Sequence, residues 1–247
     1  MSRGRAGLAV RVALTGCLLA AAGAAAHDAV DAAAADGLVE EVARLKATAE
    51  GEAAPAEKAA AWYALGAAVE SLRADLNRDL AAHGGEPGLV AAVIVAELGR
   101  LGIALSPWPQ AVRYRSQAAP FRAYLALPRD GPRAADARFA LLRAGFYDSY
   151  TTDPLSAPDL DRNALAARIG EAEDFLARHP DHEGVEEARF ILAVDYFRAV
   201  QLAPDPIARE RARAALAGYA DAYPETLRAR AARALLDRLA AMPGSTP

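Results

Sequence analysis

The chain has 247 residues, of which 53% are hydrophobic and 24% are charged, and its formal net charge is −4 at pH 7. This composition is that of a globular protein, with enough apolar material for one elongated domain or two small ones. A net acidic chain without a run of basic residues is a poor candidate for binding nucleic acid or an anionic membrane surface. Much of the hydrophobic share is alanine, which favours helices but fills little core volume.

The first 26 residues have the three-part pattern of a secretory signal peptide. A positively charged start is followed by an apolar run over 12–26 that ends in alanines, and this run is too short to span a bilayer. The charged start consists of Arg3, Arg5 and Arg11. We therefore predict a signal peptide over 1–26, a mature protein that starts at His27, and a periplasmic or secreted location.

Cys17, the only cysteine of the chain, supports an alternative interpretation of this segment. Leu14-Thr15-Gly16-Cys17 resembles a bacterial lipobox, in which a lipid is attached to the cysteine. However, the apolar run continues past Cys17 to Ala26, whereas a lipoprotein usually turns polar soon after its cysteine. An outer-membrane lipoprotein anchored through Cys17 is therefore the alternative, and it is the only form in which we expect membrane contact.

An N-terminal helical region over 27–106 is predicted to contain three helices. They cover about 28–51, 56–83 and 89–101, and glycine or proline separates them. The third is markedly apolar, but its length and the charges Glu97 and Arg100 indicate a core helix rather than a membrane span. No stretch alternates between apolar and polar residues, so no strand is expected. The proline-rich segment 106–109 predicts a boundary with the region that follows.

Residues 110–241 carry an internal repeat, with copies offset by 51 and then 44 residues. Each copy has an aromatic residue near a helix end, a turn with proline, and a new helix that carries Ala-Arg. The aligned aromatic residues are Tyr124, Phe175 and Tyr219, and the aligned alanines are Ala137, Ala188 and Ala232. Within this frame, apolar side chains fall on one face of each predicted helix. For the helix that begins near Arg162 we predict a face made of Leu165, Ile169, Ala172 and Leu176.

The helix predicted over Val185–Val200 differs from the others because apolar residues cover most of its circumference. This pattern is typical of a helix that is packed between neighbours on both sides. Beyond residue 241 we expect a flexible tail, 242–247.

Two segments resemble the divergent tetratricopeptide repeats of bacterial envelope proteins. They are Phe175-Leu-Ala-Arg-His-Pro180, followed by Glu187-Ala188-Arg189-Phe190, and Tyr219-Ala-Asp-Ala-Tyr-Pro224. Similar repeats occur in the lipoprotein of the outer-membrane β-barrel assembly machinery and in periplasmic coordinators of the cell envelope. Trp62-Tyr-Ala-Leu65-Gly66 also matches the opening W-x-x-L-G of the repeat signature, although Arg78 and Ala82 stand at its later positions.

The resemblance implies an all-α fold of stacked antiparallel helical hairpins, a tetratricopeptide-like α-solenoid, which binds partner proteins and performs no chemistry. The repeat spacing exceeds the usual period of about 34 residues, so the copies have diverged or contain insertions.

No residue pattern points to catalysis. His179, His182 and Glu183 have a spacing found in metal sites, but Pro180 and Gly184 place them in a turn, where we expect simple turn variation. Several acidic residues are predicted to lie on solvated helix faces, namely Asp159, Asp161, Glu171, Glu173 and Asp174. Phosphate-binding and dinucleotide-binding motifs are absent from the sequence. We therefore predict no catalytic residue, no cofactor and no metal.

These observations favour an exported, non-enzymatic scaffold that binds another envelope protein. Two alternatives remain open at this point. One is an envelope enzyme whose site lies in the unmatched region 84–120, and the other is a self-associating structural helical protein.

Overall fold

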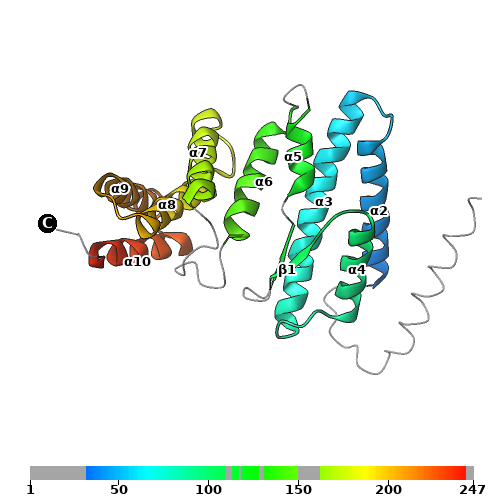
Figure 1. Ribbon diagram of the computed structural model, residues 1–247, viewed down its shortest axis with the longest axis horizontal. Coiled ribbons are helices and arrows are strands. Elements are labelled where there is room, and N and C mark those ends of the chain that lie inside the picture. The colour runs from blue at the N-terminus through cyan, green and yellow to red at the C-terminus, as the bar shows by residue number, and fades with distance from the viewer. Residues whose placement is uncertain (1–31, 109–112, 117, 128–130, 150–161, 243–247) are drawn as a thin grey trace, which may run out of the picture.

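The computed structural model describes residues 32–108, 113–116, 118–127, 131–149 and 162–242 (Figure 1). The predicted signal peptide, Cys17, Asp159, Asp161 and nearly all of the tail lie outside these residues. In the described part the chain is helical almost throughout, which confirms the all-α prediction. None of the helices there combines the length and the apolar character that a membrane crossing needs.

The N-terminal region is built from α2 (Ala32–Glu50), α3 (Pro55–Ala82) and α4 (Leu89–Arg100), close to the predicted bounds. Pro55 occupies the first turn of α3, where a missing N–H leaves no hydrogen bond unmade. Helix α2 packs along α3, and α4 packs on α2. Their shared core is aliphatic and includes Val42, Leu65, Leu72, Leu76, Ile94 and Leu98.

A short antiparallel ribbon follows, which corrects the prediction that the chain has no strands. Its strands are β1 (Ser106–Trp108) and β2 (Arg113–Arg115), with Pro107 opposite Tyr114. Three residues are too few to show an alternating pattern in the sequence. The ribbon is attached to α3, because Asn77 Oδ1 accepts a hydrogen bond from the Tyr114 N–H at 2.6 Å.

Three helical hairpins complete the fold, one in each copy of the repeat. They are α5 (Ala119–Leu125) with α6 (Ala134–Tyr147), α7 (Arg162–Arg178) with α8 (Val185–Leu202), and α9 (Pro206–Ala222) with α10 (Leu227–Ala241). The aligned aromatic residues are buried in the last turn of each first helix, and the aligned alanines are fully buried in each second helix. The residues that repeat in the sequence therefore hold the same structural place in each hairpin.

Helix α8 is enclosed on both sides, as its sequence predicts. It packs against α7 and α6 and, on the other side, against α9 and α10. Its buried side chains cover most of the helix circumference, among them Phe190, Ile191, Val194, Phe197 and Val200.

The packing continues from the N-terminal region into the hairpins across the predicted boundary at 106–109. Figure 1 shows α2, α3, α5 and α6 side by side, and α5 contacts α3 directly. Gly66, the glycine of the W-x-x-L-G match, allows this contact. A Cβ atom there would lie 2.8 Å from the Phe121 ring, closer than carbon atoms can approach.

The buried face of α7 differs from the predicted one. Leu165 and Ala172 are buried as expected, but Arg168 and Phe175 fill the positions that were assigned to Ile169 and Leu176. A prediction from apolar spacing places every arginine at the solvent. The predicted buried face of α7 therefore includes Ile169 instead of the neighbouring Arg168. The structural reason for a buried arginine is an ionic partner on α8, described below.

Because α8 is enclosed, we predict that Phe190→Ala lowers the free energy of unfolding by about 3 kcal/mol or more. The truncated ring would leave a cavity between α8 and its neighbours, where Phe190 now contacts the rings of Phe146 and Tyr219. Urea unfolding followed by circular dichroism measures this loss. A loss below about 1 kcal/mol would contradict the enclosed position of α8.

Candidate functional site

The histidines that the sequence singles out lie in the turn between α7 and α8. His182 Nδ1 accepts a hydrogen bond from the Gly184 N–H at 2.9 Å, so we assign the ring proton to Nε2. Nε2 then donates to Asp136 Oδ1 of α6 at 3.0 Å. Both ring nitrogens are therefore engaged, and neither has a lone pair available for a metal or for a substrate proton. Among the described residues no three His, Cys, Asp or Glu side chains gather in a metal-binding group.

Asp136 joins three elements at this point. Besides His182, it accepts hydrogen bonds from Arg133 at 2.8 Å and from Tyr63 of α3 at 3.3 Å. Burial opposes ionisation of this carboxyl group, but the hydrogen bonds from Arg133, His182 and Tyr63 outweigh it and lower the pKa of Asp136. The resulting carboxylate fastens the α7–α8 turn to α6 and α3.

A buried ion pair connects the middle hairpin to the first. Arg168 of α7 donates through Nε and Nη2 to the two carboxylate oxygens of Asp195 on α8, at 2.7 and 2.6 Å. Arg168 Nη1 also donates to the Gly145 carbonyl and to Ser149 Oγ, both at 2.7 Å, at the end of α6. Arg168 is 5% exposed and Asp195 is 0% exposed, so substrate cannot reach either group. Their role is to join α6, α7 and α8.

A second polar network joins the hairpins at the N-terminus of α8. Glu187 accepts a hydrogen bond from Tyr147 Oη at 2.8 Å and from Arg143 Nε at 3.1 Å, both on α6. Arg228 Nη2 of α10 lies 3.3 Å from the same carboxylate. The negative charge is also favourable at this end of α8, where the helix dipole is positive.

The neighbouring carboxylate extends this network to the last hairpin. Glu186 pairs with Arg228 Nη1 at 2.7 Å and accepts a hydrogen bond from Tyr219 Oη of α9. Burial and this hydrogen bond raise the pKa of Tyr219 to about 12, so the phenol remains a donor at neutral pH. Adjacent glutamates that could suggest acid–base chemistry are thus engaged in holding four helices together.

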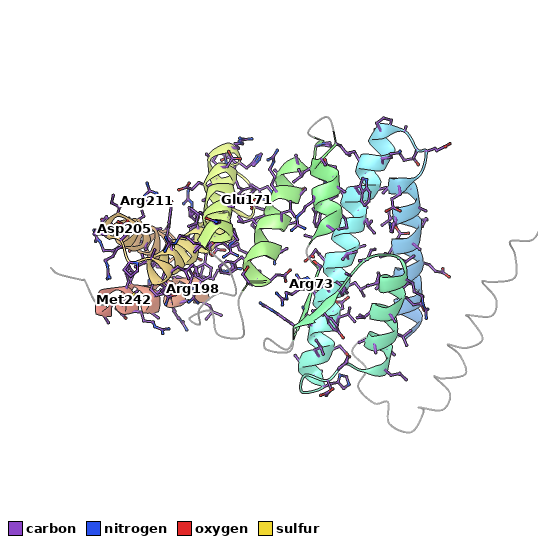
Figure 2. The ribbon with its side chains drawn as sticks, in the orientation of Figure 1. Arg73, Glu171, Arg198, Asp205, Arg211 and Met242 are labelled. Atoms are coloured by element: carbon purple, nitrogen blue, oxygen red, sulfur yellow. The ribbon has the colours of Figure 1, made fainter. Side chains whose placement is uncertain are left out.

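The β ribbon binds the C-terminal end of α6, the end that Arg168 also contacts. The guanidinium groups of Arg113 and Arg115 donate to the carbonyls of Tyr147 and Asp148, and the Arg115 contact measures 3.2 Å. These carbonyls lie at the C-terminal end of α6, where no further helical N–H groups are available to them. Positive charge is favourable beside them because this end of the helix dipole is negative. Burial lowers the pKa of Arg113, and the nearby positive charge of Arg73 on α3 adds to this effect (Figure 2).

In the region 84–120, where the sequence leaves room for an enzyme site, several of the described polar groups bind neighbouring elements. Besides the ribbon arginines, Ser116 Oγ donates to Glu70 of α3. The buried carboxylate of Asp79 accepts a hydrogen bond from the Gly88 N–H at 3.1 Å, just before α4 begins. Each of these groups therefore has a structural partner.

The α7–α9 face, defined by Glu173, Tyr196 and Arg211, is an exposed polar surface, and of its residues the sequence predicts only Glu173 to be solvated. Tyr196 of α8 is half-buried and donates a hydrogen bond to Glu173 of α7. Burial and this hydrogen bond raise the pKa of Tyr196 to about 12, and the charge of Arg211 on α9 partly offsets the rise. Arg211 is exposed and makes no hydrogen bond or ion pair with any described residue (Figure 2).

The remaining described acidic residues that were predicted to be solvated are at the surface. Glu171 is exposed on α7 (Figure 2), and Asp174 forms a surface ion pair with Arg178 at 2.7 Å. Such exposed pairs contribute little to stability.

Comparisons with protein-family models, with curated proteins and with solved structures found no match to the chain. The functional assignment therefore depends on the residues and contacts described above.

We predict that Asp195→Asn lowers the free energy of unfolding by about 3–5 kcal/mol, because it leaves the Arg168 guanidinium buried without a counter-charge. The double variant Arg168→Met/Asp195→Leu should recover most of this loss, since it removes both charges and keeps apolar volume. Urea unfolding of Arg168→Met, Asp195→Leu and the double variant gives the coupling energy between the two side chains.

A matched control comes from the exposed pair of Arg213 and Glu210 on α9. Glu210→Gln should leave the urea midpoint unchanged, because solvent screens that pair. Additive losses in the Arg168/Asp195 double variant would show that the two charges do not depend on each other.

Proposed function

We propose that the chain is an exported, non-enzymatic helical-repeat scaffold that binds another protein of the bacterial cell envelope. In this proposal its hairpins are tetratricopeptide-like units stacked as an α-solenoid. The observation that carries the proposal is the recurrence of one frame in α5–α6, α7–α8 and α9–α10, with a buried aromatic residue and a buried alanine at the same place in each hairpin. Hairpins packed in series give an extended surface for a partner rather than a closed pocket for a small molecule.

The use of the polar side chains supports a scaffold over an enzyme. A catalytic base needs a lone pair that can reach substrate, and a nucleophile needs such a base beside it. Here His182 has both nitrogens occupied, and the carboxylates of Asp136 and Asp195 each accept hydrogen bonds from a neighbouring helix or turn. These groups stabilise the arrangement of the hairpins instead.

We place the partner on the α7–α9 face. Tyrosine and arginine dominate the energy of many protein interfaces, since they combine apolar area with hydrogen-bond donors. Tyr196 is held in position by Glu173, and Arg211 presents its guanidinium to solvent beside it. The partner that fits is a protein segment with a carboxylate for Arg211 and an apolar side chain that packs on the Tyr196 ring.

Export is the second part of the proposal and is supported by the arrangement of residues 1–26. Mass spectrometry of the protein from its native envelope should find a chain that starts at His27. A chain that starts at a lipid-modified Cys17 would instead support the lipid-anchored form. An intact Met1 would contradict both forms.

We predict that Arg211→Glu reduces the recovery of the partner at least tenfold when the protein is crosslinked and pulled down from that envelope. The reversed charge would repel the partner's carboxylate, while the fold should be unaffected, because Arg211 contributes no hydrogen bond or ion pair to the described structure. Arg230→Glu on α10 is the matched control, since Arg230 is also exposed but lies on another helix.

The proposal fails if Arg211→Glu and Arg230→Glu recover the same protein equally well, or if no protein is crosslinked. A glycan or small molecule that raises the melting temperature of the purified chain would favour the enzyme alternative.

A further inference from the structure

From Leu89 to Ala96 helix α4 is apolar on all sides, but the residues that the structure describes cover it on only one side. Between Leu89 and Ala96 it contains no polar or charged side chain. Ala91, Ile94 and Leu98 are buried in the core that α4 shares with α2 and α3. A helix that is apolar around its whole circumference is normally buried on all sides.

The opposite side of α4 faces solvent, and we call it the α4 face. Leu89 is 53% exposed, Ala92, Ala96 and Gly99 are also exposed, and Val93 is half-buried. These residues follow the i, i+3, i+4, i+7 spacing, so they form one continuous strip along the helix. Among the described residues, large exposed hydrophobic side chains are few, and Leu89 is one of only three.

Exposed charges of opposite sign flank this strip along the chain. Glu86 is exposed just before α4 begins, and Arg100 is exposed in its last turn, at the same side of the helix as Leu89 and Val93. Arg100 also contacts Glu97 on its own helix, an exposed pair that costs little to exchange. The apolar strip of the α4 face is therefore preceded in the chain by an acidic residue and followed by a basic one.

We infer that the α4 face binds the α4 face of a second copy of this chain in an antiparallel, two-fold arrangement. In that arrangement each Arg100 meets Glu86 of the partner subunit, whereas a parallel arrangement would set like charges against each other. Antiparallel helix dipoles also attract. Small residues at Ala92 and Ala96 let the two helices approach to about 8–10 Å between their axes.

A face that is complementary to itself across a two-fold axis closes at two copies and needs no other partner. The inference goes beyond the proposed envelope scaffold and is independent of it, because α4 and the α7–α9 face lie on different parts of the chain.

Size-exclusion chromatography with light scattering of the full chain tests the inference over micromolar concentrations. We expect twice the mass of one chain for the wild type. Ala96→Glu places a charge at the centre of the strip and should return the mass to that of one chain. Ala234→Glu, at an exposed alanine of α10, is the matched control and should leave the dimer intact. Circular dichroism checks that each variant keeps its helical content.

A charge exchange tests the antiparallel arrangement separately from folding. Arg100→Glu should raise the dimer dissociation constant at least tenfold, and adding Glu86→Arg should restore it. The contact with Glu97 is lost in both variants, so recovery reports on the contact between the two chains. If Glu86→Arg does not restore the dissociation constant, the antiparallel arrangement is wrong.

A single-chain mass for the wild type, a dimer that survives Ala96→Glu, or a mass above two chains would overturn the inference itself.

Discussion

The buried pair of Arg168 and Asp195 is the contact on which the arrangement of the hairpins depends. Removing two charges from water costs several kcal/mol per ion, so such a pair persists only when its geometry is good and its other hydrogen bonds are made. Here two parallel hydrogen bonds join the side chains, and Gly145 and Ser149 accept from the remaining guanidinium nitrogen. Because these groups come from α6, α7 and α8, their relative positions are fixed together.

The other polar contacts extend the same principle along the chain. Glu186 and Glu187 connect α8 to its neighbours on both sides, and Asp136 connects the α7–α8 turn to α6 and α3. The ribbon arginines attach the N-terminal region to the end of α6. Charged and phenolic side chains that could suggest chemistry thus hold helices together, and this use supports the scaffold that we propose. The α7–α9 face and the α4 face are the surfaces on which we propose that partners bind.

The sequence predicts what depends on local pattern. The helix bounds follow from proline, glycine and apolar spacing. The hairpins follow from the internal repeat, in which Phe175 aligns with Tyr219. The enclosed position of α8 follows from its all-round apolar surface. The Arg168–Asp195 pair is not predictable in this way, because hydropathy assigns both residues to solvent and their contact spans 27 positions. One signal was present: Asp195 is the only acid between Ala188 and Val200 of an otherwise mostly apolar helix. The ribbon was missed because its strands are short and their stabilising bond comes from Asn77.

The most direct test of this account is hydrogen exchange of backbone amides in the native state, read by mass spectrometry for the wild type and for Asp195→Asn. If the buried pair fixes the hairpins, the variant should lose protection in α6, α7 and α8 together, while α2 and α3 exchange as in the wild type. Loss confined to α8, or unchanged exchange in all helices, would contradict the central role of the pair.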